Sequence, residues 1–181
     1  MTNEHVVGEV EATIGRMALG GRPLKIEEIH TSRSLLGIED DLAIIRCRKP
    51  HGLPPVQIAQ DPPKIGDALY FVNQYGACQH GILHFVGSRG SAFRALVEAG
   101  MVNMDDPSYH FRSKIEGLFK IAGSDIYYSG HKLHEGDSGS PVFNTQGEVT
   151  AVICAFGHLT RQSHSVSLPG MKALIEAAYA L

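Results

Sequence analysis

The clearest chemical feature of the sequence is the string GDSGSPV at residues 136–142. A serine flanked by turn-forming residues can sit on a tight turn that exposes its hydroxyl and brings backbone N–H groups together. Such donors stabilise an oxyanion, as acyl transfer by a serine requires. A Gly/Ser-rich hairpin turn is the plain alternative. The full string, with strand, turn and strand after it, predicts Ser138 as a nucleophile and the turn Gly136, Asp137 and Ser138 as the oxyanion hole, through the N–H groups of Gly136 and Ser138.

The same string resembles the nucleophile motif of the chymotrypsin-like serine proteases, Gly-Asp-Ser-Gly-Gly/Ser-Pro. The resemblance implies two partners for the serine, a histidine base and a carboxylate that orients it. Asp41 opens the string DLAII, which is similar to the segment carrying the acidic member of the family's triad. Glu39 and Asp40 are adjacent competitors, and an acidic turn ahead of a core strand is a common feature. The register of the motif favours Asp41.

The expected base lies upstream, in the string TNEHVV at residues 2–7. This string resembles the Thr-x-x-His-Val-Val segment around the catalytic histidine of HtrA-type proteases. His30 is the other upstream histidine, but it lacks the small-residue context of the family. Without the downstream motifs, His5 would be an ordinary histidine near a chain end. The resemblance therefore implies His5 as general base.

Further similarity to HtrA-type proteases runs through residues 53–56, 64–67 and 148–155. It implies an all-β chymotrypsin fold of two antiparallel β-barrels, with the site in the cleft between them and a short C-terminal helix. We expect one trypsin-like domain over residues 1–181. Residues 1–75 are expected to form the remnant of the first barrel, and residues 76–181 the second barrel and the helix.

The pattern of the chain agrees with this fold class, because short apolar runs alternate with turn residues. Helical spacing predicts helices over 91–99 and 171–178, and residues 100–115 show no clear period. Strands are expected at Ala12–Ile14, Leu42–Arg46, Ala68–Asn73, Gly81–Val86, Leu118–Ile121, Pro141–Asn144, Val149–Ala155 and His164–Leu168.

The sequence departs from the family at its start, since only four residues precede His5. In the family several strands come before this histidine, so we expect the first barrel to be incomplete. Open strand edges invite pairing with another chain, which predicts a homo-oligomer through this region. A weak or inactive protease-fold module that binds a peptide or protein partner stays an alternative, as does a protease domain cut from a longer chain.

The substrate-binding residues expected from the resemblance are Lys132, Cys154, Ala155 and Phe156. Lys132 lies six residues before Ser138 and is flanked by histidines at 131 and 134, with further histidines at 158 and 164. Cationic groups there would suit an acidic side chain of the substrate. The alternative, which the residue types favour, is that these histidines are solvated loop residues.

The composition of the chain limits which binding partners and cofactors we expect. A formal charge of −3 with scattered basic residues argues against nucleic-acid binding, and no apolar run suits a membrane span. His131-x-x-His134 lacks the spacing and partner ligands of a zinc site, so we expect no metal and no cofactor. The three cysteines cannot all pair with one another and are expected to be buried thiols in a reducing compartment, which favours a cytoplasmic location. Peptide or protein substrates are the expected partners.

Overall fold

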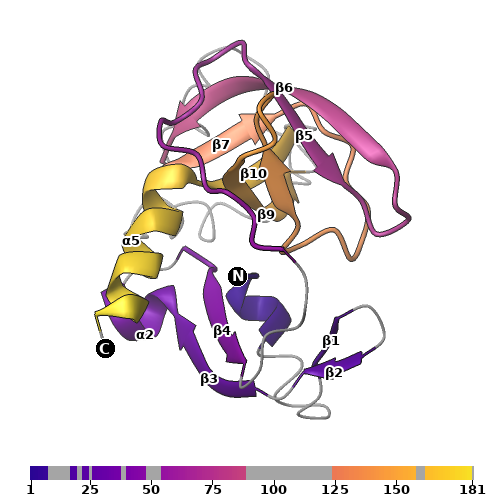
Figure 1. Ribbon diagram of the computed structural model, residues 1–181. Helices are drawn as coiled ribbons and strands as arrows, with labels where there is room; N and C mark the ends of the chain where they lie inside the picture. Colours follow the sequence, from indigo (N-terminus) through magenta and orange to yellow (C-terminus); the bar gives the residue numbers. More distant parts are fainter. Residues whose placement is uncertain are drawn as a thin grey trace, which may run out of the picture.

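The computed structural model describes residues 1–7, 17–19, 22–24, 26–37, 40–47, 54–88, 124–157 and 162–180. Figure 1 shows a larger β-barrel in the upper part of the view, smaller sheets below it, and a helix that runs along one side of both. The elements in chain order are β1 (Met17–Leu19), β2 (Arg22–Leu24), β3 (Ile26–Thr31), α2 (Ser32–Leu36), β4 (Ala43–Cys47), β5 (Ala68–Val72), β6 (Cys78–Gly87), β7 (Ile126–Ser129), β8 (Pro141–Phe143), β9 (Val149–Gly157), β10 (Gln162–Ser167) and α5 (Leu168–Tyr179).

The barrel is a closed ring of antiparallel strands in the order β10-β7-β6-β5-β8-β9. Side chains alternate between the two faces of a strand, so every second residue can point inward. In β5, Leu69 and Phe71 are buried, whereas Val72 is exposed. Leu69 and Phe71 pack in a hydrophobic cluster with residues from the other strands of the barrel: Leu83, Tyr127, Val142, Ala151 and Ile153. Closure leaves this barrel without an open strand edge.

The N-terminal part forms two antiparallel pairs, β1 with β2 and β3 with β4. Thr31 ends β3 and caps α2, since its hydroxyl accepts the Ser34 N–H at 3.1 Å. Thr2 adds a further bridge to Ala43 of β4. The described residues of this part form no closed barrel, in agreement with the incomplete first barrel expected from the sequence.

Helix α5 connects the two parts. It packs against α2 and β4 on one side and against β9 and β10 on the other (Figure 1). Its buried residues Met171, Leu174 and Ala178 recur at helical spacing, which places them on one face. Arg46 of β4 donates a hydrogen bond to the Ala178 carbonyl at 3.3 Å. The end of the chain thus fixes the N-terminal sheets against the barrel.

The structure confirms the fold class, and it extends or trims the predicted strands by a few residues. One internal boundary was wrong: β5 was assigned with residues 1–75 to the first barrel, but it pairs with β6 and β8 inside the closed barrel. Sequence patterns also missed β1, β2, β3, α2 and β7. The elements expected at 12–14, 91–99 and 118–121, and the segment 100–115, lie outside the described residues.

The cysteines differ from the expectation of buried thiols, because Cys78 is exposed and Cys47 is half-buried, whereas Cys154 is buried. Within the described ranges, no helix combines the length and the apolar character needed to cross a lipid bilayer.

The close approach of β6 to the segment after β7 predicts that Gly81→Ala destabilises the barrel. A Cβ at Gly81 would lie 2.7 Å from the His131 ring and 2.9 Å from its backbone nitrogen, so the backbone itself must shift. Overpacking of this kind costs about 1–3 kcal/mol. We expect a lower midpoint in urea, with His84→Ala, an exposed change on the same strand, close to wild type. An unchanged midpoint for Gly81→Ala would show that this contact is absent.

Candidate active site

His5 and Asp41 form a hydrogen-bonded pair. The His5 Nδ1 lies 2.7 Å from Asp41 Oδ2, and the His5 backbone N–H donates to Asp41 Oδ1 at 3.0 Å. His5 stands on a helical turn, Glu4–Val7, that follows the Thr2 bridge to β4. One carboxylate therefore holds both the ring and the backbone of the histidine, which fixes the ring orientation.

Asp41 has an unusual backbone conformation, with a φ of +55° that side-chain-bearing residues rarely adopt. Its carbonyl accepts the Asn3 side-chain amide at 2.9 Å and the Glu4 N–H at 3.3 Å. Asn3 is fully buried. Strained residues persist where surrounding contacts over-determine them, and such positions cluster at functional sites. The segment before His5 thus holds Asp41 in the conformation that reaches the ring.

Ser138 lies on a turn between two glycines of positive φ, Gly136 at +94° and Gly139 at +83°. The turn is anchored to β9, because the Gly139 N–H donates to the Ile153 carbonyl at 2.9 Å and the Ile153 N–H to the Ser140 carbonyl at 3.0 Å. A Cβ at Gly139 would overlap the Thr2 hydroxyl. The serine turn therefore touches the segment that carries His5.

The buried carboxylate of Asp137 shapes the same turn from inside. It accepts the Gln74 N–H at 3.0 Å and the His134 N–H at 2.7 Å. The Gln74 amide donates to the Glu135 carbonyl. A Cβ at Gly136 would lie 2.7 Å from Gln74 Oε1, so no larger residue fits there without a shift. The β5–β6 turn thus supports the serine turn.

The backbone donors of the turn divide into two groups. The Asp137 N–H donates to the His134 carbonyl at 3.1 Å, which removes it as an oxyanion donor in this conformation. Considering only the described residues, the N–H groups of Gly136 and Ser138 have no hydrogen-bond acceptor. Unpaired donors beside a serine are what oxyanion stabilisation needs.

The third contact of the expected triad is not made in this structure. Within the part of the chain that is described, no hydrogen bond joins the Ser138 hydroxyl to the His5 ring. Catalytic hydrogen bonds are often long without substrate and shorten in the reacting complex. The structure brings His5 to Asp41 and brings the serine turn against Thr2, three residues before His5.

A cavity of about 370 Å³ opens beside Ser138. Its apolar lining comes from Leu133, Ile153 and Ala155, and its polar lining includes His134 and Glu135. Of the expected substrate-binding residues, Ala155 lines this cavity, whereas Lys132 is exposed and outside its lining.

The other two expected substrate-binding residues lie on β9. Cys154 is buried, and its thiol donates to the His164 carbonyl at 3.3 Å, so it supports the wall from behind. Phe156 pairs through its backbone with Ser163 of β10.

His131 is a structural residue of the barrel, which corrects its assignment both as a substrate-facing and as a solvated histidine. It is 1% exposed. Its Nε2 lies 3.0 Å from the Leu69 carbonyl and its Nδ1 2.8 Å from the Ser129 hydroxyl. Because a carbonyl only accepts, Nε2 carries the proton and Nδ1 accepts from the serine. Burial lowers the pKa of His131 below its ordinary value of 6.5, so the ring is neutral.

Residues Asn3 and Gln74 were missed by sequence reasoning. Asn3 carries no signal beyond its place near His5, and Gln74 reads only as part of the turn that starts at Asn73. As for metals, the described residues contain no group of three or more His, Cys, Asp or Glu side chains able to hold an ion.

Comparison with known proteins agrees with the fold. The trypsin-like peptidase domain family matches residues 1–152, and the chain belongs to this family. A comparison with curated proteins finds no match.

Similar solved structures include Rv3671c from M. tuberculosis H37Rv in an inactive, mutant form, at 17% identity and a TM-score of 0.62, covering 99% of this chain and 76% of that one. The HtrA-type protease AlgW with decapeptide matches at 15% identity and 0.61, covering 98% of this chain and 47% of that one. Deg5 matches at 16% identity and 0.54, covering 95% and 74%. Identities this low show the fold alone.

The neutral, buried ring of His131 predicts a pH dependence of stability. Its pKa is lower in the folded than in the unfolded protein, so the unfolded chain binds the proton first as pH falls. The contribution of His131 is fully present above about pH 6.5 and is lost as pH falls toward the folded pKa. We expect the unfolding midpoint of wild type to fall more steeply between pH 7 and 5 than that of His131→Gln. Parallel profiles would contradict a neutral buried ring.

Proposed function

We propose that this protein is a serine endopeptidase in which Ser138 is the nucleophile, His5 the general base and Asp41 the residue that orients the base. The observation that carries the proposal is the 2.7 Å contact between His5 Nδ1 and Asp41 Oδ2. Beside it lies a serine turn in which the Gly136 and Ser138 N–H groups have no acceptor among the described residues. Membership of the trypsin-like peptidase family supports the reaction class.

The proposed reaction is acyl transfer. The Asp41 carboxylate accepts a hydrogen bond from the Nδ1–H of His5, which keeps Nε2 unprotonated. Nε2 then takes the proton of the Ser138 hydroxyl as the serine oxygen attacks the substrate carbonyl carbon, and Asp41 stabilises the imidazolium that forms. The Gly136 and Ser138 N–H groups stabilise the resulting oxyanion. His5 then gives its proton to the leaving amine as the C–N bond breaks. Water, activated by the same ring, hydrolyses the acyl-enzyme and restores the Ser138 hydroxyl.

Substrates are peptides or proteins, and the cavity that includes Ala155 and Ile153 is the proposed place for the side chain next to the cleaved bond. We treat residues 1–181 as one peptidase domain. Self-association through the N-terminal part stays a prediction. It is supported by the two-stranded sheets that the described residues form there, because an open strand edge can pair with another chain.

One observation favours a second candidate, an inactive module that binds peptides. It is the missing hydrogen bond between Ser138 and His5, both within the described residues. The two candidates differ in whether Ser138 reacts.

A fluorophosphonate probe separates them, because it reacts with serines whose hydroxyl is deprotonated by a neighbouring base. We expect the full-length protein to form one adduct, mapped by mass spectrometry to Ser138. Ser138→Ala should abolish labelling. Ser140→Ala, on the same turn, should label like wild type. A folded wild-type protein without a Ser138 adduct would favour the binding module.

Asp41→Asn tests the orienting carboxylate. The amide keeps the shape of the side chain but stabilises the wrong tautomer of the ring, a change that lowers kcat by about 10⁴-fold in the serine-protease template. We expect the rate of probe labelling to fall by a similar order and the unfolding midpoint to change little. If Asp40→Asn rather than Asp41→Asn abolished labelling, the adjacent carboxylate would be the orienting group.

A further inference from the structure

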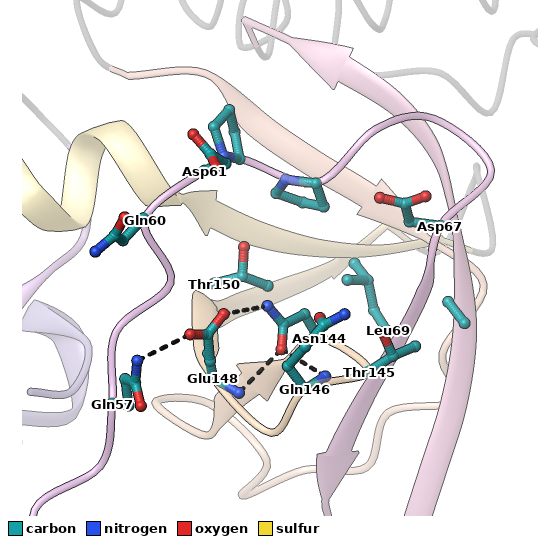
Figure 2. Close-up of a pocket in the computed structure, with 13 residues that line it drawn as sticks. Gln57, Gln60, Asp61, Asp67, Leu69, Asn144, Thr145, Gln146, Glu148 and Thr150 are labelled. Carbon is teal, nitrogen blue, oxygen red and sulfur yellow. Dashed lines mark hydrogen bonds between the residues drawn. The ribbon is translucent and has the colours of Figure 1, made fainter.

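A second cavity, of about 580 Å³, lies between the segment that leads into β5 and the turn that joins β8 to β9 (Figure 2). It shares no lining residue with the cavity beside Ser138. Its walls carry the carboxylates of Asp61, Asp67 and Glu148 together with several carboxamides. Counting only the described residues, no Lys, Arg or His forms an ion pair with these carboxylates. The carboxylates of the cavity thus have no ion-pair partner within the described ranges, and the one cationic side chain bonded there to a lining residue, Lys172, donates to the Gln60 carbonyl at 2.6 Å.

Two carboxamide donors in the wall are already bound to Glu148. The Gln57 amide donates to Glu148 Oε1 at 3.0 Å, and the Asn144 amide donates to Glu148 Oε2 at 2.9 Å (Figure 2). Asn144 Oδ1 in turn accepts the backbone N–H groups of Gln146 and Glu148. This network fixes the Glu148 carboxylate in place. Each carboxylate oxygen keeps capacity for a further donor.

Thr150 supplies an independent sign of a missing ligand. Thr150 is fully buried and belongs to the lining of the cavity. Within the described part of the chain, its hydroxyl oxygen has no hydrogen-bond partner. Figure 2 shows this oxygen directed toward the space below Asp61. A buried polar atom without a partner costs about 1–3 kcal/mol, and a ligand that donates to it would remove this cost.

The chemistry of the walls selects the ligand. Fixed acceptors and unpaired carboxylates suit a group that is cationic and carries donors only. A metal ion is a poor candidate, because the described carboxylates do not converge into a group able to coordinate one. A guanidinium group offers five N–H donors in a plane and full charge at all relevant pH, so it can reach acceptors spread around a cavity.

We propose that this cavity binds a guanidinium group, carried by an arginine side chain of a polypeptide. The proposal does not depend on proteolytic activity. The same chemistry occurs in small free compounds, so the test includes agmatine.

Binding is measured by calorimetry on the full-length protein with three ligands: acetyl-Gly-Arg-Gly-amide, its citrulline counterpart and agmatine. Citrulline keeps the shape and removes the charge. Hydrogen bonds to charged groups contribute about 1.5–3 kcal/mol, so the citrulline peptide should bind at least about tenfold more weakly. Mass spectrometry confirms that the peptide stays intact. Equal affinity for the two peptides would overturn the proposal, and agmatine binding more tightly than the arginine peptide would overturn its polypeptide part.

Substitutions in the lining test whether the arginine peptide binds in this cavity. Asp61→Asn should weaken the arginine peptide by about two- to fivefold, the range for a partly exposed ion pair. Asp125→Asn makes the same charge change at an exposed position outside the cavity and should leave affinity unchanged. Thr150→Val should weaken binding without lowering the unfolding midpoint, because the hydroxyl has no partner to lose. If Asp125→Asn and Asp61→Asn had equal effects, the binding would be general electrostatic attraction, and the cavity would not be the site.

Discussion

The double contact between the Asp41 carboxylate and His5 is the interaction on which the candidate active site depends. One oxygen meets the ring at 2.7 Å and the other the backbone N–H at 3.0 Å. Because both contacts come from one side chain, the ring cannot turn without breaking a hydrogen bond to a charged acceptor, which is among the stronger polar contacts in proteins. The Asn3 side chain donates to the Asp41 carbonyl and so helps to hold the Asp41 backbone at positive φ, the conformation in which its carboxylate reaches His5.

Strand β9 provides the other half of the site. Ile153 exchanges hydrogen bonds with Gly139 and Ser140 and so fixes the serine turn to the barrel wall. The first residue of the same strand also bonds to the segment that precedes β5. The Val149 N–H donates to the Gln57 carbonyl, and the Val149 carbonyl accepts the Ala59 N–H. Helix α5 then packs on β4 and β9 together. The distance between His5 and Ser138 therefore depends on how the N-terminal sheets pack against the barrel.

How much the sequence predicts depends on how local the cause is. The serine motif and the alternation in β5 are local, and both were recovered. β7 was missed because Ile126–Ser129 is buried on both faces and shows no alternation. α2 has only five residues, too few for a helical period, and β3 carries exposed glutamates. Gln74 and His131 owe their roles to partners far along the chain, which no spacing could reveal.

The two cavities differ in which hydrogen-bonding groups the fold leaves over. Nearly every buried N–H and carbonyl in a folded chain finds a partner, so those left unpaired mark places suited to another molecule. At the serine turn, among the described residues, the unpaired groups are the N–H donors of Gly136 and Ser138, which complement a negative oxygen. At the second cavity, again among the described residues, the buried group without a partner is the Thr150 hydroxyl, whose oxygen can accept, and the exposed Asp61 carboxylate beside it makes no ion pair. The second cavity therefore complements a cationic donor. Because β9 borders both, one strand presents an anion-stabilising turn and a cation-attracting wall at different positions along its length.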